Sequence, residues 1–151
     1  MNNPRFIRTA IEVVETAIKE NSPALLGACT PARKPFASYG RAFAGVMPNP
    51  PSVLVEPMRT QLGGEGNYLD QQDVVTVLIG LVAGSPEELQ DAMLDYVAAV
   101  TIAILAARLD AAGTVTRVWP EVQDYGPLYK TGGGFGRFAE VHVVADRAEV
   151  L

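Results

Sequence analysis

The sequence has few of the residues that hold small proteins together through covalent or metal bonds. Cys29 is its only cysteine and His142 is its only histidine among 151 residues. A single cysteine excludes an internal disulfide, and one cysteine with one histidine excludes a Cys/His zinc site within one chain. The stability of the fold must therefore come from packing.

Long hydrophobic runs are also missing. The two longest, residues 74–83 and 97–107, are shorter than the roughly 20 apolar residues that a membrane-spanning helix needs. Residues 1–20 mix charged and apolar positions and carry no secretory pattern. We therefore expect a soluble chain that is made in the cytoplasm and has no membrane partner.

Basic residues are in the minority, with 12 Lys and Arg against 17 Asp and Glu, and the net charge is −5. Nucleic-acid binding relies on basic side chains that displace phosphate counterions, so this balance argues against a nucleic-acid partner. Hydrophobic residues make up 48% of the chain, which indicates a globular protein. We expect residues 1–151 to form a single domain.

The first half of the chain predicts one helix followed by an irregular segment. Asn3 and Pro4 suit the start of a helix over residues 4–20, and Pro23 is expected to end it. Six prolines between residues 23 and 51 favour an extended segment with one short strand near residues 37–46.

Two strands and a flexible connection are predicted next. Residues 52–56 are typical of a strand, and Pro57 marks either its end or an edge position. The glycine-rich residues 60–72 are typical of a loop. Residues 73–82 form an apolar run without alternation, which predicts a strand covered on both faces.

The strongest local signal is a helix start at residues 85–88. Ser85 suits the N-cap, Pro86 the first helical position, and Glu88 the third position of a capping box. We expect a helix to Leu109, stopped by Gly113, whose apolar residues 101–107 are either buried or part of an interface.

The last part of the chain predicts strands at residues 114–118 and 138–145, separated by a long loop over residues 123–137. The order of elements favours an α+β fold. We expect a mostly antiparallel sheet with an N-terminal helix and one long central helix packed on it.

No residue pattern predicts catalysis, a cofactor or a metal site. The glycines of residues 132–136 are followed by Arg137 and a strand, whereas a phosphate loop needs Gly-Lys-Ser/Thr at a helix start. His142 and Glu140 share a strand face, but no nucleophile accompanies them, so a structural role is favoured. Glu87, Asp91 and Asp95 share a helix face, which is typical of a solvated or partner-facing surface.

The charges fall into two blocks of opposite sign. Residues 31–60 contain four basic residues and one acidic residue, and residues 61–113 contain eight acidic residues and one basic residue. If the blocks become opposite surfaces, copies would associate head to tail and close into a ring; the alternative is that folding mixes them. The candidate subunit-interface residues are Arg33, Lys34, Arg41, Arg59, Glu87, Asp91 and Asp95. The candidate partner-contact loop carries Tyr125, Tyr129, Lys130, Phe135 and Arg137.

In this order of elements the chain resembles the tail-terminator and tail-completion (neck) proteins of long-tailed bacteriophages. The resemblance runs from the helix at residues 6–18 through the strands at 52–58, with acidic Glu56, and 73–82. It continues through Ser85-Pro86-Glu87-Glu88-Leu89 into Asp95-Tyr96-Val97, then residues 113–119, Asp124-Tyr125 and the strand at 139–144. The proline-rich residues 31–51 depart from the pattern.

The resemblance implies a structural virion protein of the tail-neck region. It would form a homo-oligomeric ring, typically a hexamer, that caps the tail tube, ends tail polymerisation and binds the head-connector protein. The family has no catalytic residues or cofactors to transfer. The alternatives are a head-completion or neck adaptor of the same particle, a small-molecule binding module that uses the glycine-rich loop, and last an enzyme built on His142 and Glu140.

Overall fold

A computed structural model describes residues 6–65, 68–107 and 115–150 of the chain. These ranges contain helices α1 (Phe6–Gly27) and α2 (Pro86–Leu105). They also contain strands β1 (Ser38–Gly40), β2 (Ser52–Glu65), β3 (Tyr68–Ala83), β4 (Val115–Tyr125), β5 (Tyr129–Thr131) and β6 (Gly134–Val150). Asn3 and Pro4, which were expected to begin the first helix, and Gly113 lie outside the described residues.

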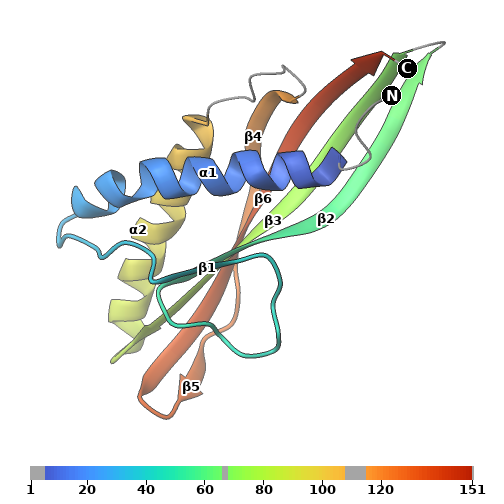
Figure 1. Ribbon diagram of the computed structural model, residues 1–151. Helices are drawn as coiled ribbons and strands as arrows, with labels where there is room; N and C mark the ends of the chain where they lie inside the picture. The colour runs from blue at the N-terminus through green and yellow to red at the C-terminus, as the bar shows by residue number, and fades with distance from the viewer. Residues whose placement is uncertain (1–5, 66–67, 108–114, 151) are drawn as a thin grey trace.

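The strands form one twisted sheet in the order β1-β2-β3-β6-β4, with β5 paired to β6 at one end. Every pairing is antiparallel except that of β1 with β2, which is parallel. Figure 1 shows α1 crossing the sheet and α2 beside it, while the long β2, β3 and β6 continue past the start of α1. The α+β fold predicted from the sequence is confirmed.

The core lies between the two helices and one face of the sheet. Alternate residues of β3, namely Val75, Val77 and Ile79, are fully buried and belong to the same cluster as Val141 and Val143 of β6. The helices complete the cluster with the following residues: Ala10, Ile11, Val14 and Ile18 of α1, and Leu89, Met93, Val97, Val100 and Ile104 of α2. Alternation in the strands therefore assigns one face to the core and leaves a second face without helices.

The second face is covered only in part. Val74 and Gly80 of β3 are buried there, whereas Thr76 and Leu78 between them are partly exposed. Near one end, Phe43 from the segment between β1 and β2 packs edge-to-face on Phe138, with ring centroids 5.2 Å apart. The prediction of a strand at residues 73–82 is confirmed, and its two faces are covered unequally.

The prediction that the first helix ends at Pro23 is wrong, because α1 continues through Pro23 to Gly27. Proline within a helix costs roughly 3 kcal/mol. The last turn is held despite this cost because Leu26, three residues after Pro23, is completely buried in the core. The short strand expected near residues 37–46 is present as the three residues of β1.

Of the two alternatives for Pro57, the edge position is confirmed, because β1 pairs only with residues 52–54 and β2 continues beyond Pro57. The expected loop at residues 60–72 is wrong. Strand β2 passes Pro57 through a bulge between Pro57 and Arg59 and pairs with β3 as far as Glu65. A bulge accommodates the proline because it removes the need for a ladder hydrogen bond at that point. The two strands therefore form one long hairpin.

The start of α2 is as predicted, and its end is not. Ser85 is the N-cap, and its Oγ accepts a hydrogen bond from the backbone N–H of Glu88 at 3.2 Å. The helix ends at Leu105 instead of Leu109, and the N–H of Ala106 bonds back to Ile102 and Ala103.

The loop expected at residues 123–137 is mostly a hairpin, because β4 continues to Tyr125 and β5 pairs with the start of β6. Two of the glycines in this segment are required by the local structure. Gly134 has a positive φ of 147° in the tight turn of this hairpin, and a side chain there would meet the carbonyl of Ala83. A Cβ at Gly136 would meet the ring of Tyr129 at 2.5 Å.

Candidate functional site

An outward stripe on α2 is the first candidate surface. The exposed residues recur at helical spacing, and they are Glu87, Asp91, Leu94, Ala98, Ile102 and Leu105. The stripe is acidic in its first half and apolar in its second half. Ile102 is 50% exposed and Leu105 is 62% exposed, so this half of the helix has an unpaired apolar surface besides its core face.

The sequence predicts that residues 101–107 are either buried or part of an interface. The structure gives this segment one buried face and one exposed face. Ala103 and Ile104 are buried, and Ile102 and Leu105 are exposed. Leu94 was not among the candidate residues, although its spacing of three from Asp91 places it on the same face. The helical period, applied to the whole helix, would have found it.

The outer edge of β2 is the second candidate surface. β1 pairs only with residues 52–54 of β2, and no other described strand pairs on that side. Met58 and Leu62 are each more than half exposed, and Arg59 is exposed between them. An open strand edge with apolar side chains is a surface that pairs readily with another chain.

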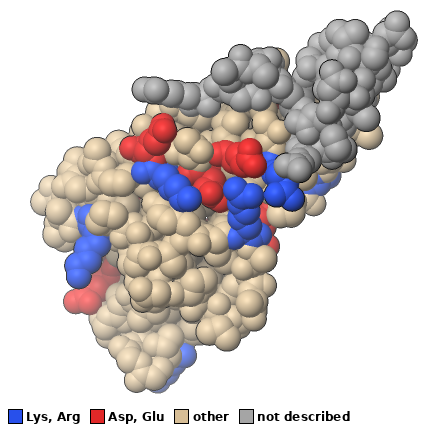
Figure 2. Space-filling view, in the orientation of Figure 1, with Lys and Arg blue, Asp and Glu red and all other residues tan. Residues whose placement is uncertain are grey.

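Two of the four basic candidates are bound within their own subunit. Arg33 forms an ion pair with Asp95 of α2, with Nε–Oδ2 2.7 Å, and Arg41 forms one with Glu15 of α1, with Nε–Oε2 3.1 Å. Figure 2 shows acidic and basic residues side by side over the face that carries α1. On that face, folding mixes the charges, whereas Lys34, Arg59, Glu87 and Asp91 are exposed.

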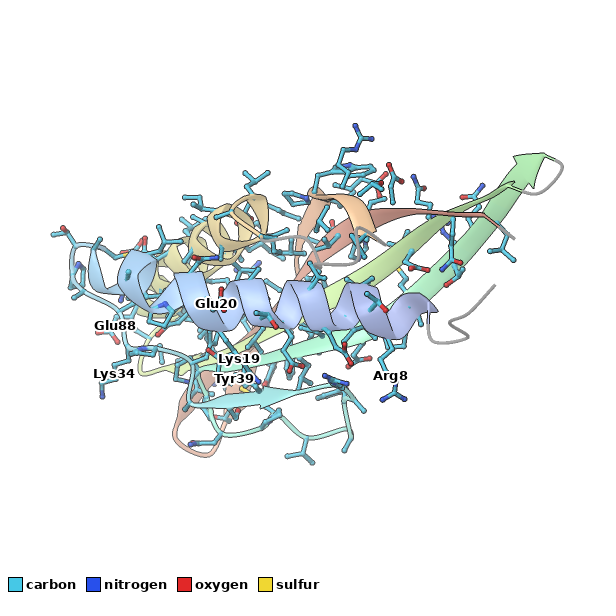
Figure 3. All side chains as sticks on the ribbon, turned by 45° about the horizontal axis from the view of Figure 1, so that its top comes forward. Arg8, Lys19, Glu20, Lys34, Tyr39 and Glu88 are labelled. Carbon is cyan, nitrogen blue, oxygen red and sulfur yellow. The ribbon has the colours of Figure 1, made fainter. Side chains whose placement is uncertain are left out.

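Glu15 is at the centre of the mixed charges. Burial alone would raise the pKa of its carboxyl, but hydrogen bonds from Arg41 and Lys19 and their positive charges lower the pKa below 4.5. The ammonium of Lys19 also lies 5.1 Å from the ring centroid of Tyr39, and Figure 3 shows these two side chains together beneath α1. The network ties β1 and the segment after it to the first helix, while Lys34 points away from the body (Figure 3).

The candidate partner-contact residues gather at the end of the sheet that carries β5. The guanidinium of Arg137 lies 5.7 Å from the ring of Tyr125, and its Nε donates to the carbonyl of Gly126 at 2.6 Å. Tyr129 stacks on Phe138 with ring centroids 6.4 Å apart, and burial raises the pKa of Tyr129. Lys130 is exposed, whereas Phe135 packs against the core. Three of the five residues, Tyr125, Tyr129 and Lys130, are thus exposed, and Arg137 is partly buried beside them.

The sheet face without helices carries a cluster that the sequence interpretation did not identify. Asp124 of β4 lies opposite Glu140 of β6, and Nε2 of His142 lies 3.1 Å from Oε2 of Glu140. Strand alternation predicts that His142 and Glu140 share a face, but the loop expected over residues 123–137 does not predict that Asp124 joins them. The register of β4 on β6 brings Asp124 to them.

Among the described residues, no helix combines the length and the apolar character needed to cross a membrane. No protein-family model matches the chain, and no curated protein sequence matches it.

The fold has a counterpart among solved structures. A chain in the structure titled "Virion of native gene transfer agent (GTA) particle" superposes with a TM-score of 0.59 and 12% sequence identity. The match covers 96% of the present chain and 99% of the other. At this identity the match establishes a shared fold over nearly the whole of both chains.

Proposed function

We infer that the protein is a structural subunit of a phage-like particle and acts as a tail terminator. Its copies form a six-fold ring in the tail-neck region that caps the tail tube, ends its polymerisation and joins the head connector. The observation that carries this proposal is the fold shared, end to end, with a chain of the gene transfer agent virion. The resemblance in element order to tail-terminator and neck proteins agrees with it.

The ring contact is assigned to the two exposed surfaces that differ in charge. The outward stripe of α2 presents Glu87 and Asp91 and then apolar Ile102 and Leu105, whereas the edge of β2 presents Arg59 between Met58 and Leu62. Both surfaces combine apolar side chains with charge, and the charges are opposite in sign. Contact between the stripe of one copy and the edge of the next is heterologous, and it closes into a ring if the rotation per copy is correct.

The basic residues have separate roles in this arrangement. Arg33 and Arg41 form ion pairs with Asp95 and Glu15 of their own subunit. We therefore do not assign them to the contact between subunits. Arg59 faces the acidic half of the next copy's stripe. We assign the end of the sheet with Tyr125, Tyr129, Lys130 and Arg137 to contact with the tail-tube or head-connector protein, because tyrosine and arginine side chains are enriched at protein interfaces.

A charge-swap experiment tests the ring contact. Arg59→Glu alone and Asp91→Lys alone should each reduce the fraction of assembled protein measured by analytical ultracentrifugation. Combining the two should restore assembly, because the swapped charges attract again. Arg8→Glu, at an exposed residue of α1, is the control for adding a negative charge elsewhere, and it should assemble like the unmodified protein. If the single variants assemble normally, or if the double variant assembles no better than either single variant, the proposed contact is wrong.

Binding to purified particle proteins tests the position in the particle. A terminator binds the end of assembled tail tubes and stops their growth at a length that depends on its concentration. Binding to the head connector with no effect on tube growth would instead assign the role of neck adaptor. Absence of binding to both would contradict the proposed function.

A further inference from the structure

We propose that Asp124, Glu140 and His142 form a binding site for one divalent transition-metal cation of the Zn²⁺ class. One oxygen from each carboxylate and one ring nitrogen of the imidazole all lie within 4.8 Å of one another. The site is on the sheet face without helices, and its three ligands belong to β4 and β6. None of these three residues is assigned to the proposed ring contact, and the test of the site does not require assembly.

The strand register fixes the three ligands on one side of the sheet. Asp124 and Glu140 are direct partners across β4 and β6, and His142 is the partner of Val122 two residues along. Residues two apart on a strand point to the same face, so Glu140 and His142 are neighbours there. Two adjacent strands of a paired sheet give a more defined spacing than a loop would.

The electrostatics of this face favour a cation. Like charges directly opposite each other in an antiparallel pair destabilise it, and Asp124 and Glu140 are such a pair. Among the described residues, no lysine or arginine forms an ion pair with either carboxylate. Glu56, in the same cross-strand row as Thr76 and His142, adds a buried oxygen with no hydrogen-bond partner.

A hollow beside the cluster provides room to complete the coordination. Asp124 and Glu140 line a cavity of about 410 Å³ and are its only charged residues, while Phe43, Leu78, Pro127 and Phe138 form much of the rest. A low-polarity wall strengthens the attraction between a cation and the two carboxylates. Water entering from the hollow can supply a fourth ligand.

The donor set selects the class of metal. Imidazole nitrogen suits Zn²⁺ and its transition-metal neighbours, whereas Ca²⁺ and Mg²⁺ prefer oxygen ligands alone. With bonds of about 2.1 Å, ligands of a tetrahedral Zn²⁺ lie about 3.4 Å apart, and His142 Nε2 is already 3.1 Å from Glu140 Oε2. Asp124 is exposed, so its side chain is free to close the remaining separation. His142 is the only histidine, so no second imidazole competes for the ion.

Metal titration of the untagged, full-length protein tests the site. Isothermal titration with ZnCl₂ should show one equivalent bound per chain, and the thermal midpoint should rise by about 5 to 10 °C at a free Zn²⁺ concentration near 100 times Kd. Co²⁺ should give visible absorption bands of a nitrogen- and oxygen-ligated ion, and Zn²⁺ should displace them. Mg²⁺ should bind at least tenfold more weakly than Zn²⁺.

Single substitutions identify the ligands. Asp124→Asn and His142→Ala should each weaken Zn²⁺ binding at least tenfold and remove the Co²⁺ bands, while the metal-free proteins keep the unmodified thermal midpoint within a few degrees. Glu121→Gln, an exposed carboxylate on the same strand, is the matched control and should bind Zn²⁺ like the unmodified protein. Absence of a one-to-one binding event, or binding that is equally strong in Asp124→Asn and His142→Ala, would overturn the proposal.

Discussion

Arg33 and Asp95 are 62 residues apart in sequence, and the Nε of Arg33 donates a hydrogen bond to Oδ2 of Asp95 at 2.7 Å. At the next position of α2, the hydroxyl of Tyr96 donates to the carbonyl of Lys34 at 2.6 Å. Two successive residues of the helix thus hold two successive residues of the segment that follows α1. This clamp fixes the proline-rich part of the chain, whose structure the sequence did not predict.

Loss of the Asp95 carboxylate should weaken the clamp. Both partners are partly exposed, at 19% and 33%, so solvent screens the pair and Asp95→Ala should cost about 1 kcal/mol of unfolding free energy. Asp91→Ala, one turn earlier and exposed, should cost almost nothing. Urea denaturation of the two variants measures the difference. Equal stability of both variants would show that the ion pair contributes nothing.

A pair of substitutions on α2 should separate folding from assembly. Val100 is completely buried in the core, so Val100→Asp places an unpaired charge there and should cost more than about 4 kcal/mol, enough to unfold the domain. Ile102→Asp, on the outward stripe, should leave a cooperative thermal transition and reduce assembly. Circular dichroism and sedimentation measure the two effects. A folded Val100→Asp protein would contradict the assignment of the core face.

Stability should depend on the ionisation of Glu15 at acid pH. Its folded pKa is lowered below 4.5, so the ionised form stabilises the fold above pH 4.5, and this contribution is lost as pH falls through the lowered pKa. Glu15→Gln should therefore be less stable at pH 7, and its difference from the unmodified protein should shrink below pH 4.5. Chemical denaturation at a series of pH values gives both curves. Glu20→Gln, exposed on the same helix, is the control for the substitution itself. Equal stability of Glu15→Gln and the unmodified protein at pH 7 would contradict this account.

The N-cap of α2 should contribute measurably to the free energy of unfolding. Ser85→Ala removes the oxygen that accepts from the N–H of Glu88, which typically costs about 1 kcal/mol. Ser85→Asp should retain the stability, because its carboxylate caps the helix and interacts favourably with the helix dipole. Thermal unfolding measures both. An unchanged midpoint in Ser85→Ala would show that the cap is not needed to hold this helix.

The parts of the fold that depend on local chemistry were predictable from the sequence. Ser85 and Pro86 indicate a helix start, because their side chains suit the N-cap and the first helical position. The apolar run of residues 73–82 indicates a buried strand, whichever strands are its neighbours. The failures occurred where tertiary contacts outweigh local preference. Burial of Leu26 holds a helix through Pro23, and pairing with β3 extends β2 through a bulge at Pro57.

The candidate surfaces were predictable to a smaller extent. Helical spacing specifies the α2 stripe, but charge counted along the sequence does not show that Arg33 and Asp95 meet inside one subunit. The Asp124, Glu140 and His142 cluster depends on the register between β4 and β6. That register is a long-range property, and two residues in a strand cannot indicate which third residue lies beside them.

The central proposal is a closed ring, and its mass in solution tests it most directly. Sedimentation velocity and light scattering of the protein alone, at high concentration, should give a single species at six times the 16.1 kDa chain mass, and negative-stain images should show rings. Tail-tube protein, added in a separate experiment, should bind these rings. Added salt should loosen the ring, because part of the contact is between exposed charges. A protein that remains a monomer at every concentration and binds no tail-tube protein would contradict the proposal.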